Sequence, residues 1–219
     1  MDAQSRKIPT HEVTYSRLRD MILFGALAPG QPVTIQGLIS DLDAGMTPVR
    51  EAIRRLTAEG ALMPQGNRRV AVPQMTESVL DQLAWARLAI EPQLARLAMR
   101  AMDSQLTERL KNLDERLNTA IAEGNIAAYL RFNHAFHFAL YEAAEAPVLL
   151  DIAQSLWLRA GPSLRLVLGR IGAAQLPDQH AEALAAMRSG DSEALAAAIA
   201  QDIAQGVTHV RQALTEGAF

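Results

Sequence analysis

The chain has 219 residues, a formal net charge of −3 and no cysteine, so it contains neither a disulfide framework nor a thiolate metal site. No apolar run approaches the ~20 residues that a transmembrane helix needs, and the first nine residues lack the apolar segment of a secretory signal. We therefore expect a cytoplasmic protein.

After a loose tail over residues 1–9, the chain is expected to form two short helices. Thr10 is placed to cap the first, which has Leu18 and Ile22 on one face and runs to about Phe24, where Gly25 ends it. Thr34 is placed to cap the second, which has apolar residues on one face at Ile35, Leu38, Ile39 and Leu42.

A third helix gives the most informative pattern in the chain. Thr47 is placed as its N-cap, and Pro48 fits the first turn because it has no N–H to leave unpaired. Its apolar residues share one face, while three arginines project elsewhere: Arg50, Arg54 and Arg55. An arginine near the start of a short exposed helix can reach a base edge or a phosphate.

Two strand candidates follow the third helix and flank a turn: 61–64 and 69–72 around 65–68. Three helices followed by such a hairpin predict a winged helix-turn-helix over residues 10–75. Arg68 and Arg69 at the tip either contact the DNA backbone or only solvate the hairpin. The first 75 residues have nine Lys/Arg against seven Asp/Glu, whereas the rest of the chain is acidic, so only the first part suits nucleic acid.

From residue 76 to residue 219 the chain is rich in Ala and Leu and has no strand signal. Helices are expected at 77–101, 106–123, 126–144, 147–159, 162–170, 177–188 and 191–215, with one of the breaks at Gly161-Pro162. Short connections between long amphipathic segments predict an antiparallel all-α bundle.

Four helix faces in this bundle are apolar except for a polar gap. The gaps are Arg87 with Glu91, Asn133 with His137, His180, and Asp202. Because buried polar groups need partners, these side chains are expected to meet one another. His134 is turned away from the apolar face of its helix and is expected at the surface.

The chain resembles the GntR family of bacterial transcription regulators, in its FadR-like branch with an all-helical effector domain. The resemblance is carried by Leu27 to Gly30, Thr47 to Ala52, Arg54 to Leu56, Glu59-Gly60, Arg87, Glu91 and Phe136-His137. It implies DNA contacts from Thr47, Arg50, Arg54, Arg68 and Arg69. The chain departs from the family at Met46, where an arginine that contacts DNA usually stands.

The resemblance also implies a divalent metal site and an effector site in the bundle. The family pattern is an aspartate and three histidines, and the matching positions here hold Asn133, His137, His180 and Asp202. Asn133 stands where the family has aspartate and Asp202 stands where it has histidine, so the total charge of the ligands is preserved. The expected metal is Zn or Ni. Arg87 is expected to face the same cavity and to bind the carboxylate of a small organic acid.

The expected protein is therefore a homodimeric regulator, a repressor, that binds an operator in double-stranded DNA and responds to a small carboxylate. It is expected not to be an enzyme and not to associate with a membrane. Two alternatives remain open. One is a metal-dependent helical-bundle enzyme acting on small organic acids, because two histidines and a carboxylate can activate water. The other is a metal-free sensor that binds its ligand through Arg87, with Asp202 or Glu91 pairing that arginine.

Overall fold

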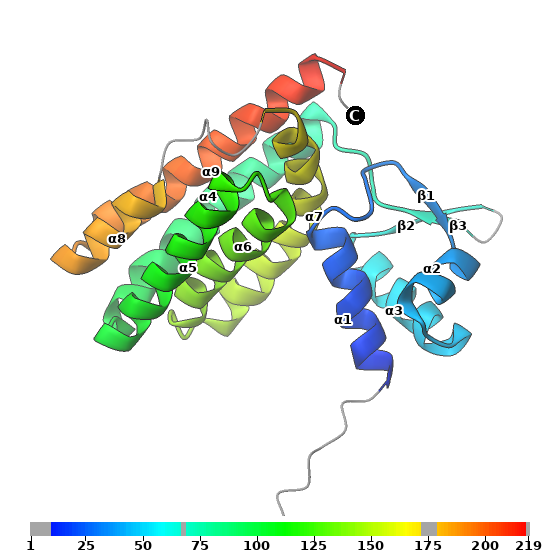
Figure 1. Ribbon diagram of the computed structural model, residues 1–219, viewed down its shortest axis with the longest axis horizontal. Helices are drawn as coiled ribbons and strands as arrows, with labels where there is room; N and C mark the ends of the chain where they lie inside the picture. The colour runs from blue at the N-terminus through cyan, green and yellow to red at the C-terminus, as the bar shows by residue number, and fades with distance from the viewer. Residues whose placement is uncertain (1–9, 67–68, 172–178, 218–219) are drawn as a thin grey trace, which may run out of the picture.

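A computed structural model describes residues 10–66, 69–171 and 179–217, and it shows a small N-terminal body beside a larger bundle of helices (Figure 1). The N-terminal body consists of α1 (Thr10–Leu23), β1 (Pro32–Thr34), α2 (Ile35–Leu42), α3 (Met46–Ala58), β2 (Met63–Gln65) and β3 (Arg69–Ala71). The bundle consists of α4 (Glu77–Ala98), the 3-10 turn η1 (Met99–Ala101), α5 (Ser104–Ala122), α6 (Ile126–Glu142), α7 (Pro147–Ile171), α8 (Gln179–Ser189) and α9 (Ser192–Thr215). The predicted fold class, a winged helix-turn-helix followed by an all-α bundle, is confirmed.

Helix α2 begins where the sequence predicts, because Thr34 caps it. Thr34 Oγ1 accepts a hydrogen bond of 2.9 Å from the backbone N–H of Gly37, which satisfies one of the free donors at the helix N-terminus. The helix ends at Asp43, whose backbone takes the left-handed conformation with φ 46°, a conformation that aspartate tolerates better than most residues. Leu38 and Leu42 are buried and fix the inner face of α2.

Helix α3 begins two residues earlier than predicted, and Thr47 does not cap it. The N-cap is Gly45, which has an extended backbone and no side chain to accept a hydrogen bond. Thr47 instead lies exposed in the first turn, so its predicted capping role is wrong. Pro48 removes no helical hydrogen bond, because the first N–H groups of a helix have no partner within it. The inner face of α3 is fully buried at Val49, Ala52 and Leu56.

The wing is a three-stranded antiparallel sheet in the order β1–β3–β2. The sequence predicts only the hairpin of β2 and β3. It misses β1 because three residues beginning with Pro32 show no apolar alternation; proline is tolerated there because β1 is an edge strand. Val33 of β1 lies opposite Val70 of the central strand. The predicted role of Arg68 falls on residues 67–68, outside the described residues.

Helix α7 runs unbroken through Gly161 and Pro162, so the predicted break there is wrong. A Cβ atom at position 161 would collide with the backbone carbonyl oxygen of Leu23 in α1. Glycine is therefore needed for the close approach of α1 to α7, and it does not end the helix. Pro162 removes only the hydrogen bond to the carbonyl one turn earlier, and the helix continues beyond it.

The two bodies share one hydrophobic core. Phe138, Trp157 and Leu158 of the bundle are buried together with apolar side chains of α1, α2 and α3. His134 lies in this interface, where its ring stacks on Phe138 with centroids 4.2 Å apart. Phe24 and Trp157 meet the same imidazole edge-on. The prediction that His134 faces the surface is wrong, because the N-terminal body covers that side of α6.

Candidate functional site

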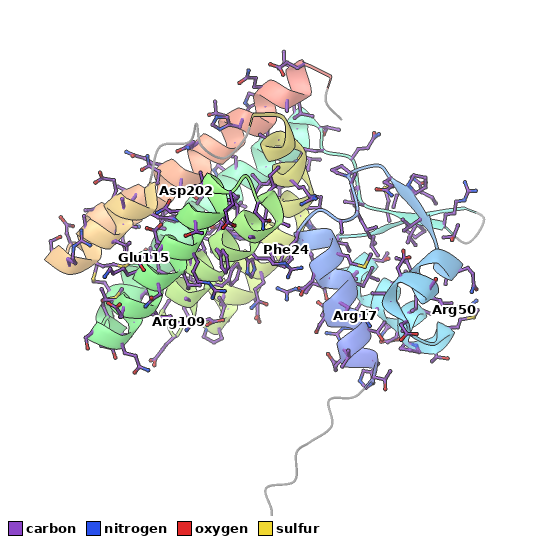
Figure 2. All side chains as sticks on the ribbon, viewed as in Figure 1. Arg17, Phe24, Arg50, Arg109, Glu115 and Asp202 are labelled. Carbon is purple, nitrogen blue, oxygen red and sulfur yellow. The ribbon has the colours of Figure 1, made fainter. Side chains whose placement is uncertain are left out.

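The outer surface of α3 presents two of the predicted DNA-contacting side chains to solvent. Arg50 is exposed and forms no ion pair with any residue that the structure describes. Thr47 is exposed three residues earlier, on the same side of the helix. Figure 2 shows Arg50 at the edge of the N-terminal body that faces away from the bundle. The guanidinium donors of Arg50 are thus available to an external acceptor.

The other arginines near α3 differ in how they are held. Arg54 is exposed and pairs with Glu51 at 2.6 Å, so a phosphate would have to replace an exposed carboxylate. Arg55 turns inward, where it pairs with Glu12 at 2.8 Å and lies over the Tyr15 ring. Arg55 therefore fixes α3 against α1. Of the two arginines predicted for the wing, the structure describes Arg69, at the start of β3, and its side chain is exposed.

Within the bundle, three helices bring His137, His180 and Asp202 to one place. Ligand atoms from these three residues all lie within 4.8 Å of one another. His137 Nε2 lies 3.2 Å from Asp202 Oδ2 and 3.4 Å from His180 Nε2. The residues come from α6, α8 and α9, so only the folded bundle brings them together.

Hydrogen bonds behind His137 determine which of its two ring nitrogens carries the proton. Tyr141 Oη donates to Glu91 Oε2 at 2.7 Å, and a phenol has only one proton to give. The 3.0 Å contact between His137 Nδ1 and Tyr141 Oη must therefore be donated by the imidazole. In a neutral His137, Nε2 then carries a lone pair that faces the Asp202 carboxylate. Two acceptors at 3.2 Å repel each other unless a proton or a metal ion lies between them.

Burial and charge act on the titration of this cluster. Burial lowers the pKa of His137, although Asp202 opposes this shift. Burial raises the pKa of Asp202, but the hydrogen bond with His137 and the charges of His137, His180 and Arg87 together outweigh burial and hold that pKa at about 2. Near neutral pH the carboxylate is ionised and the imidazole resists protonation. A metal ion between the two groups would satisfy both facing lone pairs without protonating the imidazole.

Arg87 lies beside the cluster in a buried ion pair. Its Nε and Nη2 donate to the two oxygens of Glu91 at 2.6 and 3.2 Å. Glu91 is fully buried and also accepts from Tyr141 and from Trp157 Nε1 at 2.9 Å. The Arg87 guanidinium stacks on the Trp157 ring, 4.7 Å from its centroid. Glu91 is thus bonded to the arginine and, through the Tyr141 hydroxyl, to the histidine.

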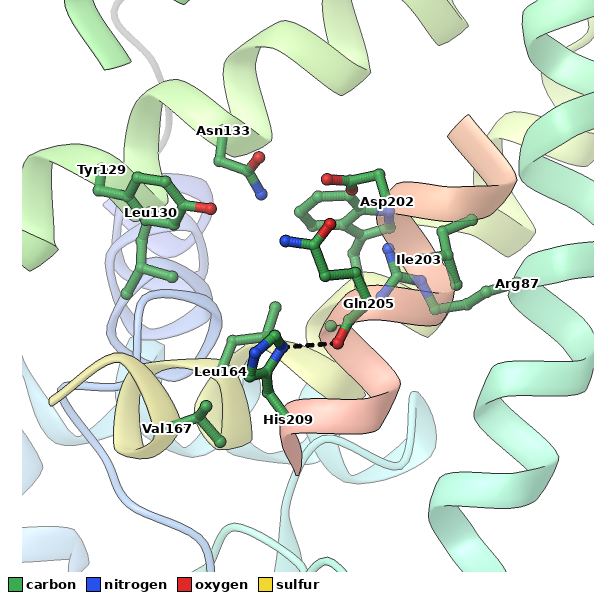
Figure 3. A pocket seen from close by; sticks show the side chains of 12 residues that line it. Arg87, Tyr129, Leu130, Asn133, Leu164, Val167, Asp202, Ile203, Gln205 and His209 are labelled. Carbon is green, nitrogen blue, oxygen red and sulfur yellow. Dashed lines mark hydrogen bonds between the residues drawn. The ribbon is translucent and has the colours of Figure 1, made fainter. Parts of the chain in front are cut away.

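A cavity of about 570 Å³, including its open mouth, lies between α4, α6, α7 and α9. Its lining consists of Arg87, Tyr129, Leu130, Asn133, Trp157, Leu164, Val167, Asp202, Ile203, Gln205, Gly206 and His209. Figure 3 shows the side chains of Asn133 and Asp202 on facing walls, with the Arg87 side chain reaching in from α4. The structure therefore places Arg87, Asn133 and Asp202, three polar residues to which the resemblance gives a role, around the same cavity.

Sequence reasoning missed two polar residues of this cavity and one behind it. Gln205 and His209 line the cavity, and the His209 ring is held by the Gln205 carbonyl at 2.7 Å (Figure 3). Their helical spacing from Asp202 was a usable signal, because residues three and seven positions later lie on one face. Asp114 lies on α5, buried 3.4 Å from His180 Nδ1. It carried no signal, since a single aspartate on an amphipathic helix is ordinary.

Comparison with known proteins gives two matches that together span most of the chain. Residues 10–72 match the gntR family of bacterial regulatory proteins, and residues 82–205 match the FCD domain. The chain belongs to the GntR family. The chain is 29% identical to the HTH-type transcriptional regulator McbR of Escherichia coli (strain K12) over 199 residues, 89% of this chain and 90% of McbR. The solved structure of E. coli McbR/YncC matches with a TM-score of 0.89 at 27% identity, covering 94% of this chain and 99% of that one.

Another relative, from Paenarthrobacter nicotinovorans, is described as the probable transcriptional repressor of a D-xylose utilization operon. It is 27% identical over 208 residues, 93% of this chain and 91% of that protein. As a GntR-family protein, this chain is a DNA-binding transcription regulator. Because these relatives are regulators, the alternative of a metal-dependent enzyme is set aside. Among the helices in the described ranges, none is long and apolar enough to span a membrane.

Proposed function

We propose that this GntR-family regulator is a homodimeric cytoplasmic repressor whose operator affinity is controlled by a small carboxylate, bound with a divalent metal ion in the bundle. The observation that carries the proposal is the convergence of His137, His180 and Asp202 on one point beside the cavity that Arg87 lines. One of the relatives is named as a probable transcriptional repressor, which supports repression of transcription over activation.

In the proposed operator complex, α3 enters the major groove and the wing follows the DNA backbone. Arg50 and Thr47 face the bases, because both are exposed on the outer side of α3. Arg54 exchanges Glu51 for a phosphate, and Arg68 and Arg69 of the wing contact phosphates. The N-terminal body has little excess positive charge, so two copies on two half-sites are needed for tight binding.

The residues present fit a divalent metal ion. Asn133 lies one turn before His137, and its buried Oδ1 has no hydrogen-bond partner among the described residues. Together with two imidazole nitrogens and the Asp202 carboxylate, this amide oxygen completes a donor set suited to Zn or Ni. When bound, the ion supplies a Lewis acid that can hold an oxygen of the effector.

Arg87 retains donors for an effector after it has bound Glu91. The ion pair uses Nε and one hydrogen of Nη2, so both hydrogens of Nη1 and one of Nη2 remain. Much of the cavity wall is apolar, including Leu130, Leu164 and Val167. A small organic acid with an apolar body matches this lining, because its carboxylate can bind the free edge of the guanidinium.

The DNA half of the proposal is tested by Arg50→Ala. Operator DNA is first selected in vitro from genomic fragments with the wild-type protein, and affinity is then measured by fluorescence anisotropy at several salt concentrations. We expect Arg50→Ala to weaken binding by about 1–3 kcal/mol and to relax the preference at one base pair in each half-site. Arg109→Ala is the matched control, because Arg109 is an exposed arginine on α5 of the bundle (Figure 2). Equal affinity and base preference for Arg50→Ala and wild type would rule out reading by α3.

The sensing half is tested on protein purified without chelator or metal-affinity resin. We expect elemental analysis to find about one Zn or Ni per chain, and chelation to lower the melting temperature until the metal is restored, because a ligand of the folded state stabilises it. Small carboxylates that raise the melting temperature of wild type should fail with Arg87→Lys, which keeps the charge but loses the planar fork. If no divalent metal is present or taken up, the metal-free sensor is the correct alternative.

A further inference from the structure

Asp114 is a buried carboxylate whose charge no described arginine or lysine balances. Its exposed fraction is 7%, and it lies on α5, outside the cavity lining. Its ion-pair partner is His180, with 3.4 Å between Oδ1 and the imidazole Nδ1. A buried carboxylate facing a neutral ring is unfavourable. The position therefore needs a source of positive charge that acts through His180.

The surroundings of His180 leave its ring few orientations. The imidazole stacks on Phe136, with ring centroids 4.2 Å apart and 15° between the planes. In this plane, Nδ1 faces Asp114 and Nε2 faces His137. On the other side of the carboxylate, Asn118 donates to Asp114 Oδ2 at 3.2 Å. Oδ1 is left without an aligned donor among the described residues, so it can accept the Nδ1–H of His180 after a small rotation of the ring.

We infer that Asp114 is a positioning residue that holds His180 with its proton on Nδ1 and directs the Nε2 lone pair to the metal ion. The inference rests on the proposed metal centre and deepens it. A ligating imidazole whose other N–H is held by a carboxylate is a stronger and better oriented ligand. Asp114 thus does for His180 what Tyr141 does for His137.

The charges around the centre support this assignment and favour a divalent ion. The negative charge of Glu91 is matched by Arg87 in their ion pair. Asp202 and Asp114 instead pair with imidazoles in the described part of the chain. An ion of charge +2 between the two histidines balances both carboxylates, one directly and one across the His180 ring.

The experiment compares Asp114→Asn with Glu115→Gln. Glu115 is the exposed neighbour on the same helix (Figure 2), so the control removes the same charge without touching His180. Affinity of the metal-free proteins for Zn²⁺ and Ni²⁺ is measured by competition with a chromophoric chelator. We expect Asp114→Asn to weaken binding roughly 10- to 100-fold and Glu115→Gln to stay within about twofold. Circular dichroism is used to check that both variants keep their helices.

A second measurement uses the wild-type protein and does not depend on how the variant folds. Long-range ¹H–¹⁵N spectra of histidine-labelled, metal-loaded protein should show His180 protonated on Nδ1 and coordinated through Nε2. Coordination through Nδ1, or unchanged affinity in Asp114→Asn, overturns the role of Asp114 and leaves the metal centre standing. If wild type binds neither ion, the proposed metal centre fails first and the role of Asp114 fails with it.

Discussion

His134 and His137 lie one turn apart on α6, yet their surroundings place opposite demands on the two imidazoles. His137 has a partner for each ring nitrogen, in Tyr141 on one side and in Asp202 or His180 on the other. His134 is enclosed by aromatic rings, and its Nε2 has no hydrogen-bond partner among the described residues. His137 is therefore suited to bind a cation, and His134 is suited to remain neutral.

The enclosed histidine should make the protein sensitive to acid. Burial lowers the pKa of His134 from 6.5 to about 3, so the unfolded chain takes up the proton first and stability falls as the pH drops below about 6.5. Replacement by phenylalanine removes this proton uptake. Between pH 7 and pH 5, we expect wild type to lose about 2 kcal/mol more unfolding free energy than His134→Phe. Urea unfolding at the two pH values measures the difference.

A control for this change is Phe24→Leu, which alters the same ring cluster but keeps His134. It should retain the wild-type loss of stability on acidification. Any packing strain from phenylalanine at position 134 acts equally at both pH values and cancels in the comparison. A parallel pH dependence of wild type and His134→Phe would show that the buried imidazole is not the acid-sensitive group.

At the scale of elements, the contact between α1 and α7 depends on Gly161. A side chain there meets the backbone of α1, which cannot move aside as a flexible side chain can. We expect Gly161→Ala to destabilise the protein by about 1–3 kcal/mol, the usual cost of overpacking a core. Thermal or urea denaturation measures the loss.

Gly206→Ala in α9 provides the comparison for Gly161→Ala. Its new Cβ would lie 3.7 Å from Leu164 Cδ2, an ordinary contact, and alanine favours a helix over glycine by about 0.5–1 kcal/mol. Gly206→Ala should therefore be neutral or stabilising. If both variants behave alike, the approach of α1 to α7 does not require glycine.

The sequence predicts those elements whose causes are local. Thr34 caps α2 as expected, because its cap bond reaches only three residues along the chain, whereas the cap predicted at Thr47 was wrong because α3 extends back to Gly45. The break at Gly161-Pro162 was predicted wrongly, because the reason for that glycine lies in Leu23, far away in the chain. The same distinction applies to the polar centre. Helical spacing identifies His137 and Asp202 as gaps in apolar faces, but the part that Asp114 plays depends on how α5 meets α8. The proposed domain division at residue 75 and the roles of the DNA-contacting residues stay predictions.

At the scale of the whole molecule, Trp157 connects the cavity with the N-terminal body. On one side it donates to Glu91 and carries the Arg87 guanidinium on its ring. On the other side it contacts Phe138 and His134. The His134 ring in turn meets Phe24, the residue directly after α1. The acid proposed to bind Arg87 would act on this indole directly, because the guanidinium lies on its ring. Because the two bodies share a core, a shift of Trp157 can change how α1 and α3 are placed.

Trp157→Phe tests this connection, because phenylalanine keeps an aromatic ring but cannot donate to Glu91. DNA affinity is measured with and without an acid identified by its thermal stabilisation of the metal-loaded protein. We expect the affinity without acid to stay within about twofold of wild type, and the acid-induced change, typically 1–3 kcal/mol in coupled sites, to fall by at least half. Trp85→Phe makes the same chemical change at a tryptophan that is 76% exposed on α4, and it should respond like wild type. By reciprocity, operator DNA should also change the affinity for the acid less in Trp157→Phe than in wild type. A full response in Trp157→Phe would place the coupling elsewhere in the bundle, because the indole N–H would then contribute nothing to it.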